Sequence, residues 1–459
     1  MILKNFAYLS LLGLASAQSA SVTDMASAAQ STDPTEECQP YSADIVNNIK
    51  DQFPEIWKPA TIVDGDDDAQ QKYNEIKQVI PSNIQPKGTH DGDFSNTTPD
   101  YDASDPDCWF TYDKCTSPKI DGLAEDFWKA PEPNTWSLGF DDGPNCSHNT
   151  FYNFLSDNDL TATMFYIGSN VMNWPYQAQR GVEDGHQICL HTWSHHYMTS
   201  FDDEGAFAEL YYPIKAIKAI TGVTPTCWRP PFGDVDDRIR IIAEGLGLRT
   251  ALWEYDTNDW KIGTEVTPDK VEQNYQDVID AANDGKFDDA GTIVLTHEIT
   301  GPTMDMFMKM FPKIRDAFEY VVPFYAARNI TNLYVGDDDE NTGETFAEYV
   351  SDVYNGTSVE AATSTNSNEH PPATVTGTSG ALATVANPTV ASIEGASATD
   401  IIKAQAASTN NNDNTDGDDG NNGNGDEDGD SSAFSFGGSF SLASGAALML
   451  STAFVTFAL

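Results

Sequence analysis

Two histidines and a neighbouring carboxylate have the types and spacing of a metal-dependent hydrolytic site. His191 and His195 lie four residues apart, so on a helical turn they would face the same way and could bind one cation. Asp142 would complete a set of three protein ligands that leaves an open coordination position. This set favours zinc, and cobalt fits it as well. The alternative is a pair of structural histidines, with His196 beside them.

Asp141 precedes the proposed ligand and is free for a different role. Neighbouring side chains on a strand diverge, so Asp141 could act as the general base that activates water while Asp142 binds the metal. Arg229 could orient Asp141 through a bidentate ion pair, or it could form only a structural salt bridge. In isolation, the sequence Asp-Asp-Gly-Pro that starts at Asp141 would be read as a surface turn.

His297 follows an apolar run typical of a buried strand and is a candidate general acid for a leaving nitrogen. A carboxylate at Asp256 or Asp259 could hold its tautomer and keep its pKa high. A lone histidine at such a position is more often a structural core residue. Trp260 and Leu295 could form a small apolar slot for an acetyl methyl group, although both are also ordinary core residues.

The segment 134–335 must position these side chains, and its pattern predicts a parallel α/β fold. Short apolar runs alternate with helical segments over about seven βα units, which indicates a barrel-like architecture. The polar clusters come at or just after the predicted strands, which places them on the carboxyl-end face of such a barrel. The predicted strands are 135–140, 162–168, 187–190, 226–229, 248–255, 291–296 and 324–333, and the predicted helices include 206–220, 237–245 and 268–284.

Five ordered motifs in this segment resemble those of carbohydrate esterase family four, the polysaccharide deacetylases. They are Gly139–Pro144, His191–His195, Arg229–Gly233, Asp256–Trp260 and Ile293–His297. The resemblance implies a distorted (β/α) barrel. It also implies the site roles, which are Asp141 as base, His297 as acid, Arg229 as the residue that orients the base, and Asp142, His191 and His195 as metal ligands.

The same resemblance implies that the backbone amide of Phe232 helps to stabilise an oxyanion. Many family members have tyrosine at that position and threonine where this chain has Gly139. Of the two acidic candidates beside the acid, we expect Asp256 to orient His297.

The two ends of the chain differ in composition from the centre. Residues 1–20 have the apolar run and small residues of a signal peptide, with an N-terminal membrane anchor as the alternative. Residues 358–440 are rich in Ser, Thr, Asn, Asp and Gly and predict a disordered stalk. Residues 441–459, with small residues around Ser431, are typical of a removable glycolipid-anchor signal, with a tail anchor as the alternative.

Residues 38–133 show no catalytic spacing, and we expect an extension packed on the main domain rather than an independent carbohydrate-binding module. The six cysteines predict disulfides, because the chain carries secretory features. The glycosylation sequons fit the same compartment and lie at Asn96, Asn145, Asn329 and Asn355. A formal net charge of -47 argues against nucleic acid as a partner.

The full layout is similar to that of fungal chitin deacetylases. It implies hydrolysis of the N-acetyl groups of chitin to chitosan and acetate, by a monomer held at the plasma membrane through a glycolipid or in the cell wall. Two alternatives remain. One is a deacetylase of another glycan, such as peptidoglycan or acetylated xylan. The other is a non-catalytic wall-binding protein, although every proposed base, acid and metal position holds a competent residue.

Overall fold

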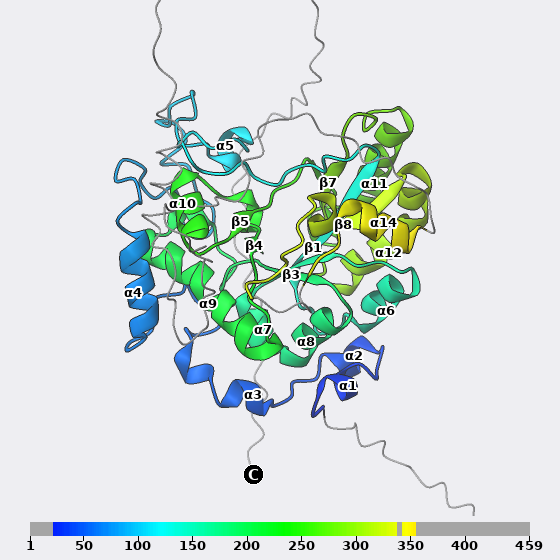
Figure 1. Cartoon of the computed structure of the whole chain (residues 1–459), viewed down its shortest axis with the longest axis horizontal. Coiled ribbons are helices and arrows are strands. Elements are labelled where there is room, and N and C mark those ends of the chain that lie inside the picture. Colours follow the sequence, from blue (N-terminus) through cyan, green and yellow to red (C-terminus); the bar gives the residue numbers. More distant parts are fainter. Residues whose placement is uncertain (1–21, 337–341, 355–459) are drawn as a thin grey trace, which may run out of the picture. The chain divides into compact units, whose positions relative to one another are not determined.

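The fold is a parallel sheet curved into a distorted barrel with helices outside it, as Figure 1 shows. The computed structural model describes residues 22–336 and 342–354. Along the sheet the strand order is β5-β4-β3-β2-β1-β7-β6, and β8 also pairs with β1. The expected barrel is therefore confirmed. The strands are β1 Thr135–Gly143, β2 Thr163–Tyr166, β3 Gln187–Leu190, β4 Cys227–Trp228, β5 Arg249–Thr250, β6 Tyr255–Asp256, β7 Thr292–Leu295 and β8 Tyr320–Pro323.

Two predicted strands need correction. The predicted strand 248–255 is divided into β5 and β6, which pair with β4 and β7 at opposite ends of the strand order. The predicted strand 324–333 begins instead with a helical turn, α13 (Phe324–Ala327), which follows β8. The second error arises because a short apolar run is compatible with a buried strand and with a buried helix.

Helices cover the outside of the barrel, and their boundaries follow local capping chemistry. The helix α9 (Asp203–Thr221) begins after Asp202, whose carboxylate accepts from the amide of Gly205 at 2.8 Å, and it ends at Gly222 with φ 86°. The other helices of the barrel are α6 Asn149–Asp157, α7 Gly168–Asn173, α8 Pro175–Glu183, α10 Asp237–Gly245, α11 Pro268–Asn283, α12 Gly301–Ala317 and α14 Phe346–Val353.

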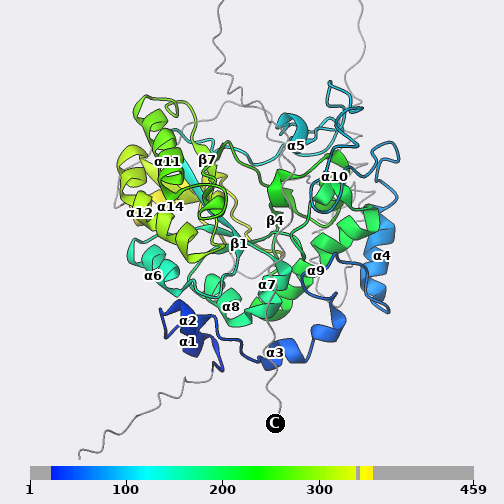
Figure 2. The ribbon, with the colours of Figure 1, turned by 180° about the vertical axis from the view of Figure 1, so that it is seen from behind.

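The N-terminal extension wraps around the barrel and shares its core. In Figures 1 and 2 its first helices border α8 and α9. Tyr73 and Ile76 of the extension are buried in the same apolar cluster as the barrel helices, so the extension is not an independent module. Its helices are α1 Met25–Ala28, α2 Pro34–Glu37, α3 Asp44–Asn47, α4 Asp67–Ile76 and α5 Phe110–Asp113.

All six cysteines form disulfides, which indicates an oxidising compartment. One bond joins Cys38 of the extension to Cys146, just after β1, and another joins Cys189 on β3 to Cys227 on β4. The third, between Cys108 and Cys115, closes a loop within the extension. No helix in the described ranges has the length and apolarity needed to cross a bilayer.

The predicted signal peptide, stalk and anchor signal (1–20, 358–440 and 441–459) lie outside the described residues, as do Ser431 and Asn355.

Close packing at the start of β7 generates a stability prediction. A Cβ atom at Gly291 would overlap the carbonyl oxygen of Thr135 and lie 2.8 Å from that of Glu132. Because both neighbours are backbone atoms, Gly291→Ala should lower the free energy of unfolding by roughly 1–3 kcal/mol. Gly301→Ala is the matched control, since a Cβ there has no neighbour within 4 Å. Equal midpoints of denaturant unfolding for the two variants would contradict this packing.

Candidate active site

The sheet brings the five predicted motifs together at the carboxyl ends of its strands. Asp141 and Asp142 lie at the end of β1, His191 follows β3, Arg229 follows β4, and His297 follows β7. The backbone fixes β1 against the loop after β7, because the amide of Asp141 donates to Thr296 and its carbonyl accepts from Glu298, both at 3.0 Å. The motifs therefore share one end of the barrel, as the sequence predicts.

Asp142, His191 and His195 converge into a group that could hold a metal ion. The Nε2 atoms of His191 and His195 lie 3.3 and 3.0 Å from Oδ1 of Asp142. The Nδ1 atom of His191 lies 2.8 Å from the carbonyl oxygen of Arg229, which can only accept, so Nδ1 carries the proton. Nε2 is therefore the ring nitrogen of His191 that faces Asp142 and would be offered to a metal ion.

The charge on Asp142 shows that this triad suits a cation. Its Oδ1 is buried and receives no hydrogen bond from a backbone amide or hydroxyl of the described residues. Burial raises the pKa of Asp142, but the imidazoles of His195 and His191 outweigh burial and hold the pKa well below its ordinary value. A buried, ionised carboxylate with two imidazole nitrogens beside it forms a fitting donor set for a divalent metal ion.

Backbone conformation, rather than a helix, brings the two histidines together. Residues 191–195 form bends and no helix, so the predicted helical turn is wrong. Asp142, Thr192 and His195 have φ values of 72°, 65° and 58°, the left-handed region that non-glycine residues seldom adopt. Such strain persists only where surrounding contacts fix it, and it is common at functional sites.

Glu209, which the sequence interpretation missed, is the main contact that fixes this loop. It is fully buried on α9, and its carboxylate accepts from the amides of Trp193 and Ser194 at 3.1 and 2.9 Å and from the Ser194 hydroxyl at 2.6 Å. It also accepts from the amide of Ala60 in the extension at 2.7 Å. A single acidic residue within the apolar pattern of a helix was the available signal.

The proposed base, Asp141, is held by Arg229. One guanidinium nitrogen of Arg229 donates to Oδ1 of Asp141 at 2.7 Å, and another donates to the carbonyl of Leu252 at 3.3 Å. The expected bidentate pair is therefore not formed. Arg229 is fully buried, with its guanidinium 4.2 Å from the ring centroid of Phe165. The second oxygen of Asp141 lies 3.9 Å from Nε2 of His191, beside the triad.

The proposed acid, His297, is held by Asp259 and not by Asp256. Oδ1 of Asp259 lies 2.6 Å from Nδ1 of His297, and its Oδ2 accepts from the His297 amide at 3.0 Å. The Asp256 carboxylate instead accepts from the amide of Asn258 at 2.7 Å. The choice of Asp256 is therefore wrong, because Asn258, with φ 54°, reverses the chain and turns the next residue inward.

The environment of His297 keeps it protonated over a wide pH range. Burial lowers its pKa, but Asp259 more than offsets this effect through its charge and hydrogen bond, with smaller contributions from Asp142 and Asp141, and the net pKa rises to about 10. Because Nδ1–H of His297 donates to Asp259, Nε2 is the nitrogen left to face the site.

Three predicted substrate contacts lie at different depths. Phe232 is left-handed with φ 59°, and its half-exposed ring stacks on Tyr197 at 4.1 Å and lies 4.8 Å from the ring of His195. Trp260 is half-exposed beside Lys261, whereas Leu295 is buried. The acetyl slot formed by Trp260 and Leu295 stays a prediction.

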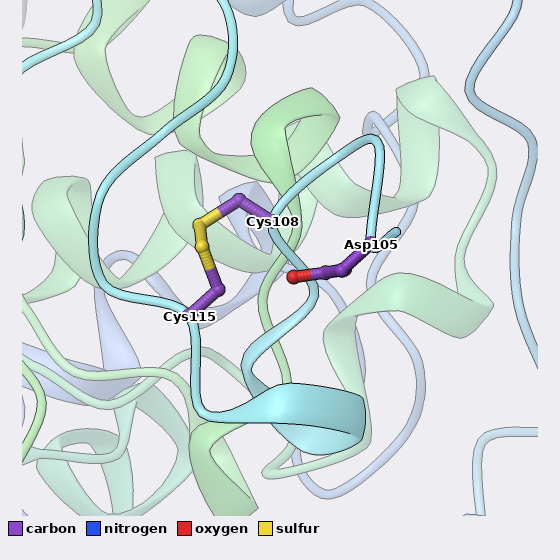
Figure 3. Close-up of side chains that lie close together, drawn as sticks. All are labelled: Asp105, Cys108 and Cys115. Atoms are coloured by element: carbon purple, nitrogen blue, oxygen red, sulfur yellow. A yellow bond between two sulfur atoms is a disulfide. The ribbon is translucent and has the colours of Figure 1, made fainter. Parts of the chain in front are cut away.

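A second cluster of metal-binding residue types lies in the extension and has a structural role. Figure 3 shows Cys108 and Cys115 joined by their disulfide, beside Asp105. Oxidised sulfur atoms are not thiolate ligands. Oδ1 of Asp105 accepts from the amide of Trp109 at 2.8 Å and from the hydroxyl of Tyr101 at 2.7 Å.

The described glycosylation candidates differ in accessibility. Asn96 and Asn329 are exposed. The side-chain amide of Asn145 donates to the carbonyl of Ile299 at 2.7 Å, which occupies the nitrogen that a glycan would need. Asn96 and Asn329 therefore remain the better predicted acceptors.

Known proteins with similar sequences come from one family. The polysaccharide deacetylase profile matches residues 129–251. The chain is 52% identical to chitin deacetylase 2 of Cryptococcus neoformans var. grubii, over 73% of this chain and 74% of that protein. It is 46% identical to the chitin deacetylase of Amylomyces rouxii, over 67% and 74%. Among solved structures, the chitin deacetylase of Colletotrichum lindemuthianum covers 49% of this chain and 96% of that chain, at 21% identity and a TM-score of 0.42.

The chain therefore belongs to the polysaccharide deacetylase family. The relatives that match most of its length are named chitin deacetylases.

The contacts of Glu209 generate a prediction about metal binding. Glu209→Gln would turn an amide group toward donors that now share two carboxylate oxygens, leaving at least one buried donor unpaired at a cost of roughly 1–3 kcal/mol. We expect weaker zinc binding, measured by competition with a chromophoric chelator, and a lower unfolding midpoint. Glu204→Gln, at an exposed position of the same helix, is the matched control. Unchanged zinc affinity in the Glu209 variant would refute this positioning role.

Proposed function

We propose that this chain is a metal-dependent chitin N-deacetylase, which hydrolyses the N-acetyl groups of N-acetylglucosamine units and releases acetate. The proposal rests on the arrangement of five side chains. The triad of Asp142, His191 and His195 lies beside a carboxylate and a histidine that are each held by a buried partner of opposite charge. The names of the relatives that match most of the chain support chitin as the substrate.

The triad would hold one divalent cation, with zinc favoured by its two nitrogens and one oxygen and cobalt compatible with the same set. A cation bound there supplies Lewis acidity that polarises the acetamide carbonyl. The low pKa of Asp142 keeps its carboxylate ionised, which is the state that metal binding needs.

Asp141 serves as the general base. Arg229 holds one of its oxygens, which leaves the other free to accept a proton from the attacking water. The backbone amide of Phe232 donates to the oxyanion that forms as the carbonyl is attacked. The left-handed backbone at Phe232 supports this role, because the surrounding loop holds it in an uncommon conformation.

His297 serves as the general acid. Asp259 binds Nδ1, and Nε2 then donates its proton to the departing amine as the carbon–nitrogen bond breaks. A pKa of about 10 means that His297 carries this proton at neutral pH.

The disulfides and the composition of the chain support a proposal for its cellular location and partners. The disulfides support a secreted protein. We propose that it is a monomer, held through a glycolipid at the plasma membrane or in the cell wall. The negative charge of the chain opposes binding to nucleic acid.

The central test is acetate release from chitin oligosaccharides. The purified protein with zinc or cobalt should release acetate, and a chelator should abolish the release. Asp141→Asn should lower kcat by about 10²–10⁴-fold, the usual contribution of a general base, while metal content stays unchanged. Absence of acetate from the folded, metal-loaded protein with chitin and with other acetylated glycans would reject catalysis.

The pH profile tests the acid. His297 must be protonated to act, so kcat should fall as pH rises through its pKa of about 10. In Asp259→Asn the carboxylate that raises this pKa is lost, so the alkaline limb should move to lower pH. Asp256→Asn, whose side chain bonds Asn258, should leave that limb nearly in place. An unshifted limb in the Asp259 variant would show that another group acts as the acid.

A further inference from the structure

Most of the exposed large apolar side chains in the described part of the chain lie on segments at the active-site end of the barrel. Phe232 and Trp260 belong to site motifs, and Ile299 follows His297 by two residues. Two others, Ile56 and Trp57, come from the N-terminal extension, and Trp57 is the most exposed of the set at 43%. Exposed apolar groups that gather at one place commonly mark a binding surface.

Hydrogen bonds place Trp57 beside the metal-ligand loop. Its amide donates to the hydroxyl of Ser169 at 2.8 Å, and that hydroxyl donates to the carbonyl of Trp193 at 2.6 Å. Ser169 comes three residues after Tyr166, where β2 ends, so it lies at the carboxyl-end rim. The next residue, Asn170, donates to the carbonyl of Asp142 at 2.8 Å. Trp57 is thus connected to both segments that carry the triad.

The segment that carries Trp57, residues 53–63, is a strap clamped to the same loop. Phe53 stacks on Trp193 with ring centroids 5.9 Å apart, and the indole nitrogen of Trp193 donates to the carbonyl of Glu55 at 3.1 Å. On the other side of Trp57, the amide of Ala60 donates to the buried Glu209 at 2.7 Å. The strap is therefore fixed on both sides of its exposed tryptophan.

The backbone conformation of Trp57 favours a ligand-binding role for its indole. Trp57 has φ 61°, a region in which a bulky side chain is strained. Glycine or asparagine would adopt this backbone at lower cost, and folding still leaves 43% of this large apolar residue exposed. A strained, exposed aromatic residue beside an active site fits a binding role better than a structural one.

We propose that Trp57 is a stacking platform for a sugar unit of the chitin chain at the rim of the substrate groove. This inference rests on the proposed function. The C–H face of a pyranose ring is apolar and packs against an indole, while its hydroxyls stay in water. In the strand order β2 lies on one side of β1, and β7 and β6 lie on the other. Trp57 is held beside the end of β2, between the two strand ends that carry the triad, whereas Trp260 follows β6, so the two tryptophans would contact different sugar units. In this proposal the unit on Trp57 is not the one that is hydrolysed.

Trp57→Gly tests the platform, because glycine accepts the left-handed backbone and preserves the strap. We expect the KM for a chitin pentasaccharide to rise by about 3- to 10-fold, as loss of one stacking contact implies, with kcat and metal content unchanged. The KM for the disaccharide should stay the same. Trp57→Phe should restore part of the affinity, and Lys58→Ala, at an exposed position of the same strap, should change nothing.

The outcomes separate this inference from the proposed function. An active Trp57→Gly variant with unchanged KM for every chain length would overturn the platform. If the wild-type protein releases no acetate, the proposed function fails, and the platform is tested by calorimetric binding of the pentasaccharide. Equal affinities of the wild type and Trp57→Gly in that measurement would overturn the platform as well.

Discussion

The structure depends on one electrostatic constraint, the burial of the Asp142 carboxylate against two imidazole nitrogens. Removing a charge from water is costly unless it is paired or binds a metal, so this carboxylate needs its partners at fixed positions. His191 is oriented by a carbonyl on the neighbouring strand connection, and His195 by a strained bend. The strands and loops around β1 can be understood as the scaffold that keeps these three ligand atoms together.

The proposed base and the proposed acid each form a buried ion pair with a residue of opposite charge. Arg229 donates a hydrogen bond to Oδ1 of Asp141, and Nδ1 of His297 donates one to Asp259. Each pair is buried, where an ionic hydrogen bond is stronger than in water and its geometry is fixed. One pair orients the proposed base and the other raises the pKa of the proposed acid, so the two groups are set up for different roles in one pocket.

The N-terminal extension contributes contacts that support the candidate active site. A disulfide joins it to the chain just after β1, and Glu209 on α9 accepts hydrogen bonds from both the extension and the loop between the metal ligands. Trp109 and Thr111 of the extension donate to the buried Asp234, which follows the loop of Phe232. The extension therefore supports the loops that hold the ligands and the proposed oxyanion donor, and its strap supplies the exposed Trp57.

The sequence alone predicted the parallel barrel and the residues proposed as metal ligands, base and acid, because βα periodicity and polar residues at strand ends are local patterns. Which carboxylate orients His297 depends on the tertiary fold, since Asp256 and Asp259 are equivalent in spacing until the left-handed Asn258 turns one inward. The same holds for the bends between the histidines, for Glu209 and for the cysteine pairing. These features arise mainly from contacts between residues far apart in the chain, and a local pattern does not identify the partner in such a contact.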